Sequence, residues 1–109
     1  MKKLRPRIRA LKLATKVRER LSAELGKPVK VILFGSQARG DATKESDIDL
    51  FVILPSMDND VLNLALDIAW EIGFDAGRVI SVIPDTEDAM QRFRFLPFYR
   101  NIEKDGIAV

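Results

Sequence analysis

Apolar residues in the first quarter of the chain recur at steps of three and four positions, which places them on one side of a helix. They are Leu4, Ile8, Leu11, Ala14, Val17, Leu21 and Leu25. This stripe predicts a long amphipathic helix that ends at Gly26. Proline is tolerated only in the first turn of a helix, so the regular helix is expected to begin near Pro6.

Three later runs are short, apolar and rich in β-branched residues. They predict buried strands over residues 29–34, 48–54 and 79–83. Pro55 and Pro84 are expected to end the second and third of these strands, because proline cannot donate to a ladder.

The remaining segments are predicted to be turns and helices. Residues 35–40 predict a tight turn or one helical turn, and residues 41–46 a polar loop. Helices are predicted over residues 58–72, 85–94 and 98–104, with Gly73 and Gly106 placed to end the first and the last. Four aromatic residues near the C-terminus are expected mainly in the core: Phe93, Phe95, Phe98 and Tyr99.

The resulting order is helix, strand, strand, helix, strand, helix, which is typical of an α/β or α+β domain with a small sheet covered by helices. A length of 109 residues favours a single domain. Residues 1–26 are expected to form a basic amphipathic helix, and residues 29–84 the core.

Histidine and cysteine are both absent from the chain. Their absence excludes Ser-His triads, thiol catalysis, disulfides and imidazole- or thiolate-bound zinc. It also suits a reducing cytoplasm, where we expect the protein to be. The longest apolar runs are about five residues, far below the ~20 that cross a bilayer, so no membrane role is expected.

The net charge of +2 hides a division of charge along the chain. The first 30 residues contain 11 Lys and Arg against two Glu, whereas the remainder contains 7 basic and 14 acidic side chains. The first helix could therefore contact nucleic acid or an acidic partner. A solvated face opposite the apolar stripe is the simpler interpretation, because no aromatic residues are interleaved for base stacking.

Two acidic residues, Asp47 and Asp49, open the second predicted strand. Residues i and i+2 of a strand point to the same face, so their carboxylates are expected to project together. Such a pair raises the pKa of both groups unless a cation compensates. Oxygen ligands suit Mg²⁺ or Mn²⁺, which also bind substrate phosphates, so the pair predicts a metal site.

Gly35 and Ser36 directly follow the first predicted strand. Glycine allows a backbone conformation that other residues resist, and the amides after it could face a phosphate. The Ser36 hydroxyl could add a hydrogen bond, and Arg39 could either counter phosphate charge or hold the loop in an ion pair. A Gly-Ser turn alone is common, so the combination with the Asp pair is what points to function.

The pattern Gly35-Ser36-x-Ala38-Arg39-Gly40, followed by Ser46-Asp47-Ile48-Asp49-Leu50, resembles the signature of the nucleotidyltransferase superfamily that includes DNA polymerase beta. Within it, the pattern is similar to that of the minimal nucleotidyltransferases of bacteria and archaea. The resemblance implies a polymerase beta-like fold, with a mixed sheet of three or four strands. It further implies the transfer of a nucleoside monophosphate, with AMP expected, from an NTP to a hydroxyl group with Mg²⁺ or Mn²⁺.

The resemblance also implies roles and partners. Asp47 and Asp49 would be catalytic and hold the metal, while Gly35, Ser36, Arg39 and Ser46 would bind the nucleotide. Many minimal nucleotidyltransferases pair with a HEPN-domain protein as antitoxin and toxin, and some attach AMP to a tyrosine of that partner. A HEPN-domain partner and an antitoxin role are therefore expected here, and a homo-oligomer stays open.

The third predicted strand departs from the family pattern. Where the superfamily has a third carboxylate, this sequence has Ser81. Asp75 and Asp85 lie near the ends of that strand, but they read more simply as surface loop acids. Three functions stay open. The chain could be a transferase, slow because it lacks the third carboxylate, or a catalytically inactive regulator that acts by binding. It could also be a nucleic-acid-binding module that uses the basic helix.

Overall fold

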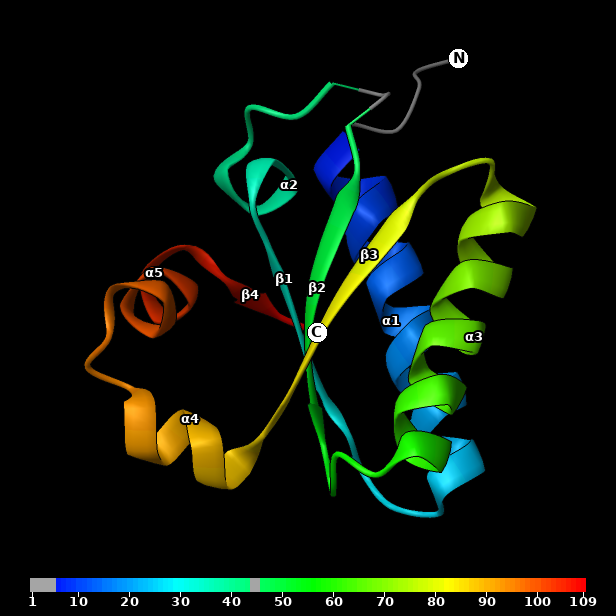
Figure 1. The fold of residues 1–109 in the computed structure, drawn as a ribbon. Coiled ribbons are helices and arrows are strands. Elements are labelled where there is room, and N and C mark those ends of the chain that lie inside the picture. Colours follow the sequence, from blue (N-terminus) through cyan, green and yellow to red (C-terminus); the bar gives the residue numbers. More distant parts are fainter. Residues whose placement is uncertain (1–5, 44–45) are drawn as a thin grey trace.

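The computed structural model describes residues 6–43 and 46–109, and it contains one mixed sheet of four strands within them (Figure 1). The strand order is β3-β2-β1-β4. β1 (Lys30–Phe34) pairs antiparallel with β2 (Ile48–Leu54) and β4 (Ile107–Ala108), whereas β3 (Ile80–Thr86) runs parallel to β2. The expected mixed α/β fold is confirmed.

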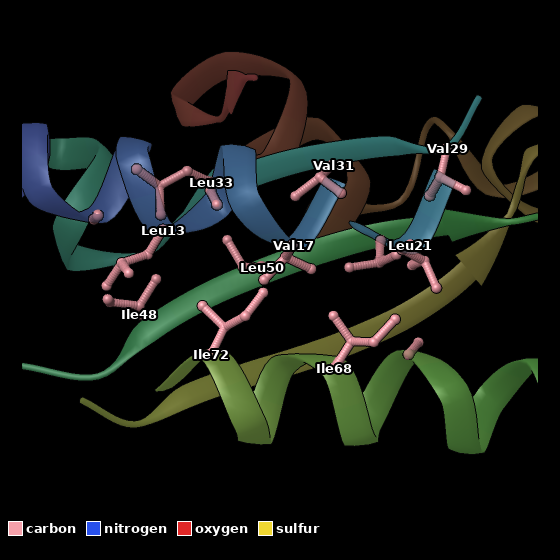
Figure 2. Packing of buried hydrophobic residues seen from close by; sticks show 14 of the residues in the cluster. Leu13, Val17, Leu21, Val29, Val31, Leu33, Ile48, Leu50, Ile68 and Ile72 are labelled. Atoms are coloured by element: carbon pink, nitrogen blue, oxygen red, sulfur yellow. The ribbon is translucent and has the colours of Figure 1, made fainter. Parts of the chain in front are cut away.

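Two long helices, α1 (Pro6–Leu25) and α3 (Asn59–Ala76), cover one face of the sheet (Figure 1). The apolar stripe of α1 explains this placement, since Ala14, Val17 and Leu21 are completely buried. They pack with alternate residues of the strands, such as Leu33 and Leu50, to form the main core (Figure 2). α1 begins at Pro6, as predicted, and Leu4 of the stripe lies outside the described residues.

The opposite face carries α4 (Glu87–Phe93) and α5 (Pro97–Asp105) (Figure 1). A smaller apolar cluster forms beneath them around Phe51, Ile53 and Ile102, with Tyr99 packed against it. Since β2 contributes to both clusters, its residues are buried on both sides along most of its length. This explains why its sequence reads as a continuous apolar run after Asp49.

A single helical turn, α2 (Ser36–Arg39), follows β1 directly. It lies at the end of the sheet where β1 finishes and β2 begins (Figure 1). Gly40 ends it in the left-handed region, with φ +87°. Of the two predicted possibilities, a tight turn and a helical turn, the structure contains the helical turn.

Two predicted boundaries are corrected. Gly73 does not end the third helix, which continues to Ala76 and is capped by Gly77 at φ +67°. Gly73 lies inside α3 because a Cβ there would be 2.6 Å from the carbonyl oxygen of Arg78, so helix and strand approach too closely for a side chain. Pro84 lies within β3 rather than after it, which is possible because β3 is an edge strand.

The aromatic prediction near the C-terminus is wrong for three of its four residues. Phe93, Phe95 and Phe98 are exposed, whereas Tyr99 is half-buried against Phe51. The reason is that α4 and α5 are short and cover only part of their face of the sheet. Within residues 6–43 and 46–109, none of the helices combines the length and apolar character needed to cross a bilayer.

Candidate active site

The register between β1 and β2 brings the two sequence motifs together. Phe34, the last residue of β1, pairs with Asp49, so Gly35 follows immediately beside that aspartate. A Cβ built on Gly35 would overlap the Oδ2 atom of Asp49. Gly35 has φ +74° and ψ −153°, a region open almost only to glycine. The Gly-Ser turn therefore lies directly over the Asp49 carboxylate.

Charge links three of the predicted site residues. Burial raises the pKa of Asp49 above its ordinary value, and the nearby Asp47 carboxylate raises this pKa further. The Arg39 guanidinium acts in the opposite direction and lowers it. Asp49 is half-buried, whereas Asp47, just before β2, is exposed. The structure thus brings Asp47 and Arg39 close enough to Asp49 to act on its charge.

The carboxylate oxygens at the site suit a cation that is also coordinated by the substrate. Among residues 6–43 and 46–109, no group of three His, Cys, Asp or Glu side chains converges on a metal position. Asp47 and Asp49 alone form an all-oxygen pair whose repulsion a divalent cation would relieve. Mg²⁺ binds in this manner, through one or two carboxylates together with water and substrate phosphates.

Ser36 and Arg39 lie at the two ends of α2. The Ser36 side chain is half-buried, and its backbone carbonyl accepts hydrogen bonds from the amides of Gly40 and Asp41. Arg39 is exposed and forms an ion pair of 3.5 Å with Asp41. The ion pair within the loop is thereby confirmed, whereas a role for Arg39 in countering phosphate charge stays a prediction.

Ser46 lies in the loop that precedes β2. Its hydroxyl oxygen accepts a hydrogen bond of 3.0 Å from the Thr43 amide. This contact gives the Ser46 side chain a role in shaping the loop. Its expected contact with a nucleotide stays a prediction.

Ser81 occupies the place beside Asp49 on the neighbouring strand. The two residues are partners in the parallel ladder, so their side chains project from the same face. Asp85 does not supply the missing third carboxylate beside Asp49. Its partner in the ladder is Ile53, and its side chain accepts a hydrogen bond of 2.6 Å from the Tyr99 hydroxyl. Asp75 lies in α3 and lines a groove between α1 and α3 on the other face of the sheet, so the interpretation of Asp75 and Asp85 as loop acids is wrong.

Three residues that sequence reasoning missed hold this site together. Gln37, in α2, is 1% exposed, and its Nε2 donates to the carbonyls of Ser46 and Asp47. Arg78 also donates to the Ser46 carbonyl, and Arg7 donates to the carbonyls at the end of α2. The Gly-Ser motif leaves position 37 unspecified, so it contains no signal for Gln37. No local pattern marks Arg7 or Arg78, because their partners are about 30 residues away.

The basic first helix uses several of its charges internally. Arg9 donates to the carbonyl of Ala76 at the end of α3, and Arg20 forms an ion pair of 2.6 Å with Glu71. With Arg7, these residues act as structural contacts rather than as a free cationic face. Lys12 and Lys16 line the groove of about 720 Å³ between α1 and α3, on the side of the sheet opposite Asp49. Lys2, Lys3 and Arg5 lie outside the described residues.

Comparisons with known proteins bear on the family and the fold of the chain. A family model described as Nucleotidyltransferase domain matches residues 14–109, which include both motifs. A protein of Methanocaldococcus jannaschii, named as a candidate protein adenylyltransferase, is 35% identical over 82 residues, or 74% of this chain and 77% of that protein. The crystal structure of a candidate nucleotidyltransferase from Sulfolobus solfataricus superposes with a TM-score of 0.56 at 24% identity, over 94% of this chain and 81% of that one.

Proposed function

Because the chain belongs to the nucleotidyltransferase domain family, and so is a transferase of that type, we propose that it transfers AMP from Mg²⁺-bound ATP to a hydroxyl group on a protein partner. The observation that carries the proposal is the position of Gly35 directly against Asp49. It places a turn suited to phosphates beside a carboxylate pair suited to a cation. The choice of AMP and of a protein acceptor is supported by the name of the Methanocaldococcus jannaschii relative.

Asp47 and Asp49 are the residues that would hold Mg²⁺. When bound, the cation would neutralise charge on the phosphates of ATP. The raised pKa of Asp49 fits this role: burial and, after it, repulsion from Asp47 disfavour the free carboxylate, and a bound cation would compensate both. Gly35 and Ser36 would bind the triphosphate, the first through its open backbone and the second through its hydroxyl. Arg39, which is exposed beside Asp49, would add positive charge at the phosphates.

In the proposed reaction, the acceptor oxygen forms a bond to the α-phosphorus as the bond from that phosphorus to the pyrophosphate oxygen breaks. The hydroxyl proton leaves to solvent, because Ser81 is a poor base at neutral pH. General-base help is typically worth 10²–10⁴-fold, so its absence slows the reaction without preventing it. The remaining acceleration comes from positioning and charge neutralisation.

The acceptor that we propose is a tyrosine hydroxyl of a HEPN-domain partner, which would make this chain an antitoxin. This part of the proposal comes from the similarity of residues 35–50 to the minimal nucleotidyltransferases. The exposed aromatic side chains of Phe93, Phe95 and Phe98 provide apolar surface on the same side of the sheet as Asp49. Such surface is common where proteins bind one another.

The test is to incubate the chain with Mg²⁺, ATP labelled on its α-phosphate and a HEPN-domain protein of the same organism. We expect label on the partner, and a loss of at least about 10²-fold in the rate for Asp47→Asn and Asp49→Asn. Asp67→Asn removes an exposed carboxylate of α3 and serves as the matched control, with an unchanged rate. Equal labelling by all four proteins would contradict the proposal.

A second function is favoured by one observation, the serine that stands beside Asp49 in the ladder. In this second function, the chain regulates its partner protein by binding alone and transfers no nucleotide. The same experiment separates the two functions. A tight complex that carries no label, and that survives Asp47→Asn, would support the binding regulator.

A further inference from the structure

Gln37 is a buried polar residue at the centre of the candidate site. Its side chain is 1% exposed, whereas Ser36 of the same motif is half-buried and Arg39 is exposed. The Nε2 atom donates to the Ser46 carbonyl over 3.3 Å and approaches the Asp47 carbonyl at 3.5 Å. An amide on the helical turn that carries Ser36 therefore contacts the peptide that leads into Asp47.

The Ser46 carbonyl receives a second donor from another part of the chain. Arg78, which precedes β3, donates to it through Nη2 over 2.5 Å. The backbone just before Asp47 is thus held from α2 on one side and from the start of β3 on the other. Arg7 in turn fixes α2, since its guanidinium donates to the carbonyls of Gln37 at 3.3 Å and Ala38 at 2.6 Å.

Packing alone does not account for a glutamine at this position. Among the described residues, the Oε1 atom of Gln37 is buried without a hydrogen-bond partner. Burying an unpaired amide oxygen costs roughly 1–3 kcal/mol, a penalty that a leucine or methionine of similar size would avoid. Asp47 itself is exposed and precedes the first residue of β2, so the ladder does not fix its orientation.

We propose that Gln37 is a positioning residue, which holds the Ser46–Asp47 peptide so that the Asp47 carboxylate faces the same cation as Asp49. The inference rests on the proposed function in that this cation is the one that nucleotidyl transfer uses. Gln37 acts through the backbone and does not touch the metal. Contacts of this indirect kind typically change metal affinity by 10- to 100-fold when they are removed.

The experiment compares Gln37→Leu with Gln91→Leu. Gln91 is exposed on α4, where its side-chain amide donates a hydrogen bond of 3.4 Å to Glu87, so it is a matched control for loss of an amide. Mn²⁺ binding is measured by electron paramagnetic resonance, and folding by thermal unfolding without metal. We expect Gln37→Leu to unfold at or above the wild-type temperature and to bind Mn²⁺ at least about tenfold more weakly. Gln91→Leu should match the wild type in Mn²⁺ affinity.

Arg78→Met provides a second measurement, because Arg78 and Gln37 donate to the same carbonyl. The losses of Mn²⁺ affinity in the two single variants are expected not to add in the double variant, because the two residues share a partner. Wild-type Mn²⁺ affinity in a folded Gln37→Leu, or fully independent effects in the double variant, would overturn the inference. Because these readouts need no AMP transfer, failure of the transfer assay would overturn the proposed function separately.

Discussion

At Gly35 the backbone adopts φ +74° and ψ −153°, and the Asp49 carboxylate lies where a side chain would begin. We expect Gly35→Ala to reduce AMP transfer by about 100-fold, because the added methyl group displaces the carboxylate from the position that the reaction requires. Steady-state rates with labelled ATP measure this change.

Gly26→Ala is the matched control for Gly35→Ala. Gly26 also has a positive φ, +69°, but a Cβ there would meet nothing within 4 Å. This variant should lose about 1–2 kcal/mol of stability from the left-handed backbone and keep the wild-type rate. Similar losses of rate in both variants would mean that backbone strain, and not the contact with Asp49, explains the effect.

Ser81 stands beside Asp49 in the parallel ladder, where a carboxylate could accept the proton of the attacking hydroxyl. We expect Ser81→Asp to raise the rate of AMP transfer by about 10²-fold, at the lower end of the range for general-base help. Ser81→Asn has a similar size but cannot accept the proton, and it should leave the rate near that of the wild type. A pH–rate profile taken with the aspartate variant should show a new dependence on an acidic group. If the rate does not rise with aspartate, or rises equally with asparagine, position 81 is not where a general base would act.

At the scale of single elements, α3 begins with a charged cap. The Asp58 side chain accepts a hydrogen bond of 3.0 Å from the Val61 amide and another from Ser56, and these bonds lower the pKa of Asp58 from its ordinary value of 3.8. An acid whose pKa is lowered by folding stabilises the native state above its unfolded pKa. That stabilisation should be lost as the pH falls below 3.8 and through the lower folded pKa.

Asp58→Asn tests this pH dependence, because asparagine caps a helix equally well but does not titrate. Denaturant midpoints measured from pH 7 to below pH 4 should fall more steeply in the wild type than in the variant. The difference in pH dependence between the wild type and the variant should shrink at high salt, since Asp58 is exposed. Parallel curves would show that the Asp58 cap does not couple folding to protonation.

The elements that the sequence predicted well are those that local pattern determines. The apolar stripe of α1 and the continuous run of β2 led to correct positions. The errors have long-range causes. Gly73 was mistaken for a helix end because only the fold brings the Arg78 carbonyl against it, and the two-residue strand β4 exists only through pairing with β1. Gln37 became visible as a site residue only from its contacts with Ser46 and Asp47.

At the scale of the whole molecule, the sheet separates the proposed site from the basic groove. Lys12 and Lys16 lie between α1 and α3, whereas Asp49 projects from the face that carries α4 and α5. We therefore expect Lys12→Glu with Lys16→Glu to leave AMP transfer within about twofold of the wild-type rate, since screening weakens charge effects over such separations. A large, salt-dependent loss would instead indicate that the groove recruits the acceptor or a nucleic acid.

In the proposed function, Asp47 and Asp49 carry out nucleotidyl transfer beneath the Gly35-Ser36 turn. The most direct measurement is the intact mass of the acceptor protein after incubation with Mg²⁺, ATP and either the wild type or Asp49→Asn. We expect an acceptor heavier by one AMP with the wild type and unchanged with the variant. An acceptor heavier by a phosphate, or the same mass with both proteins, would contradict the proposed function.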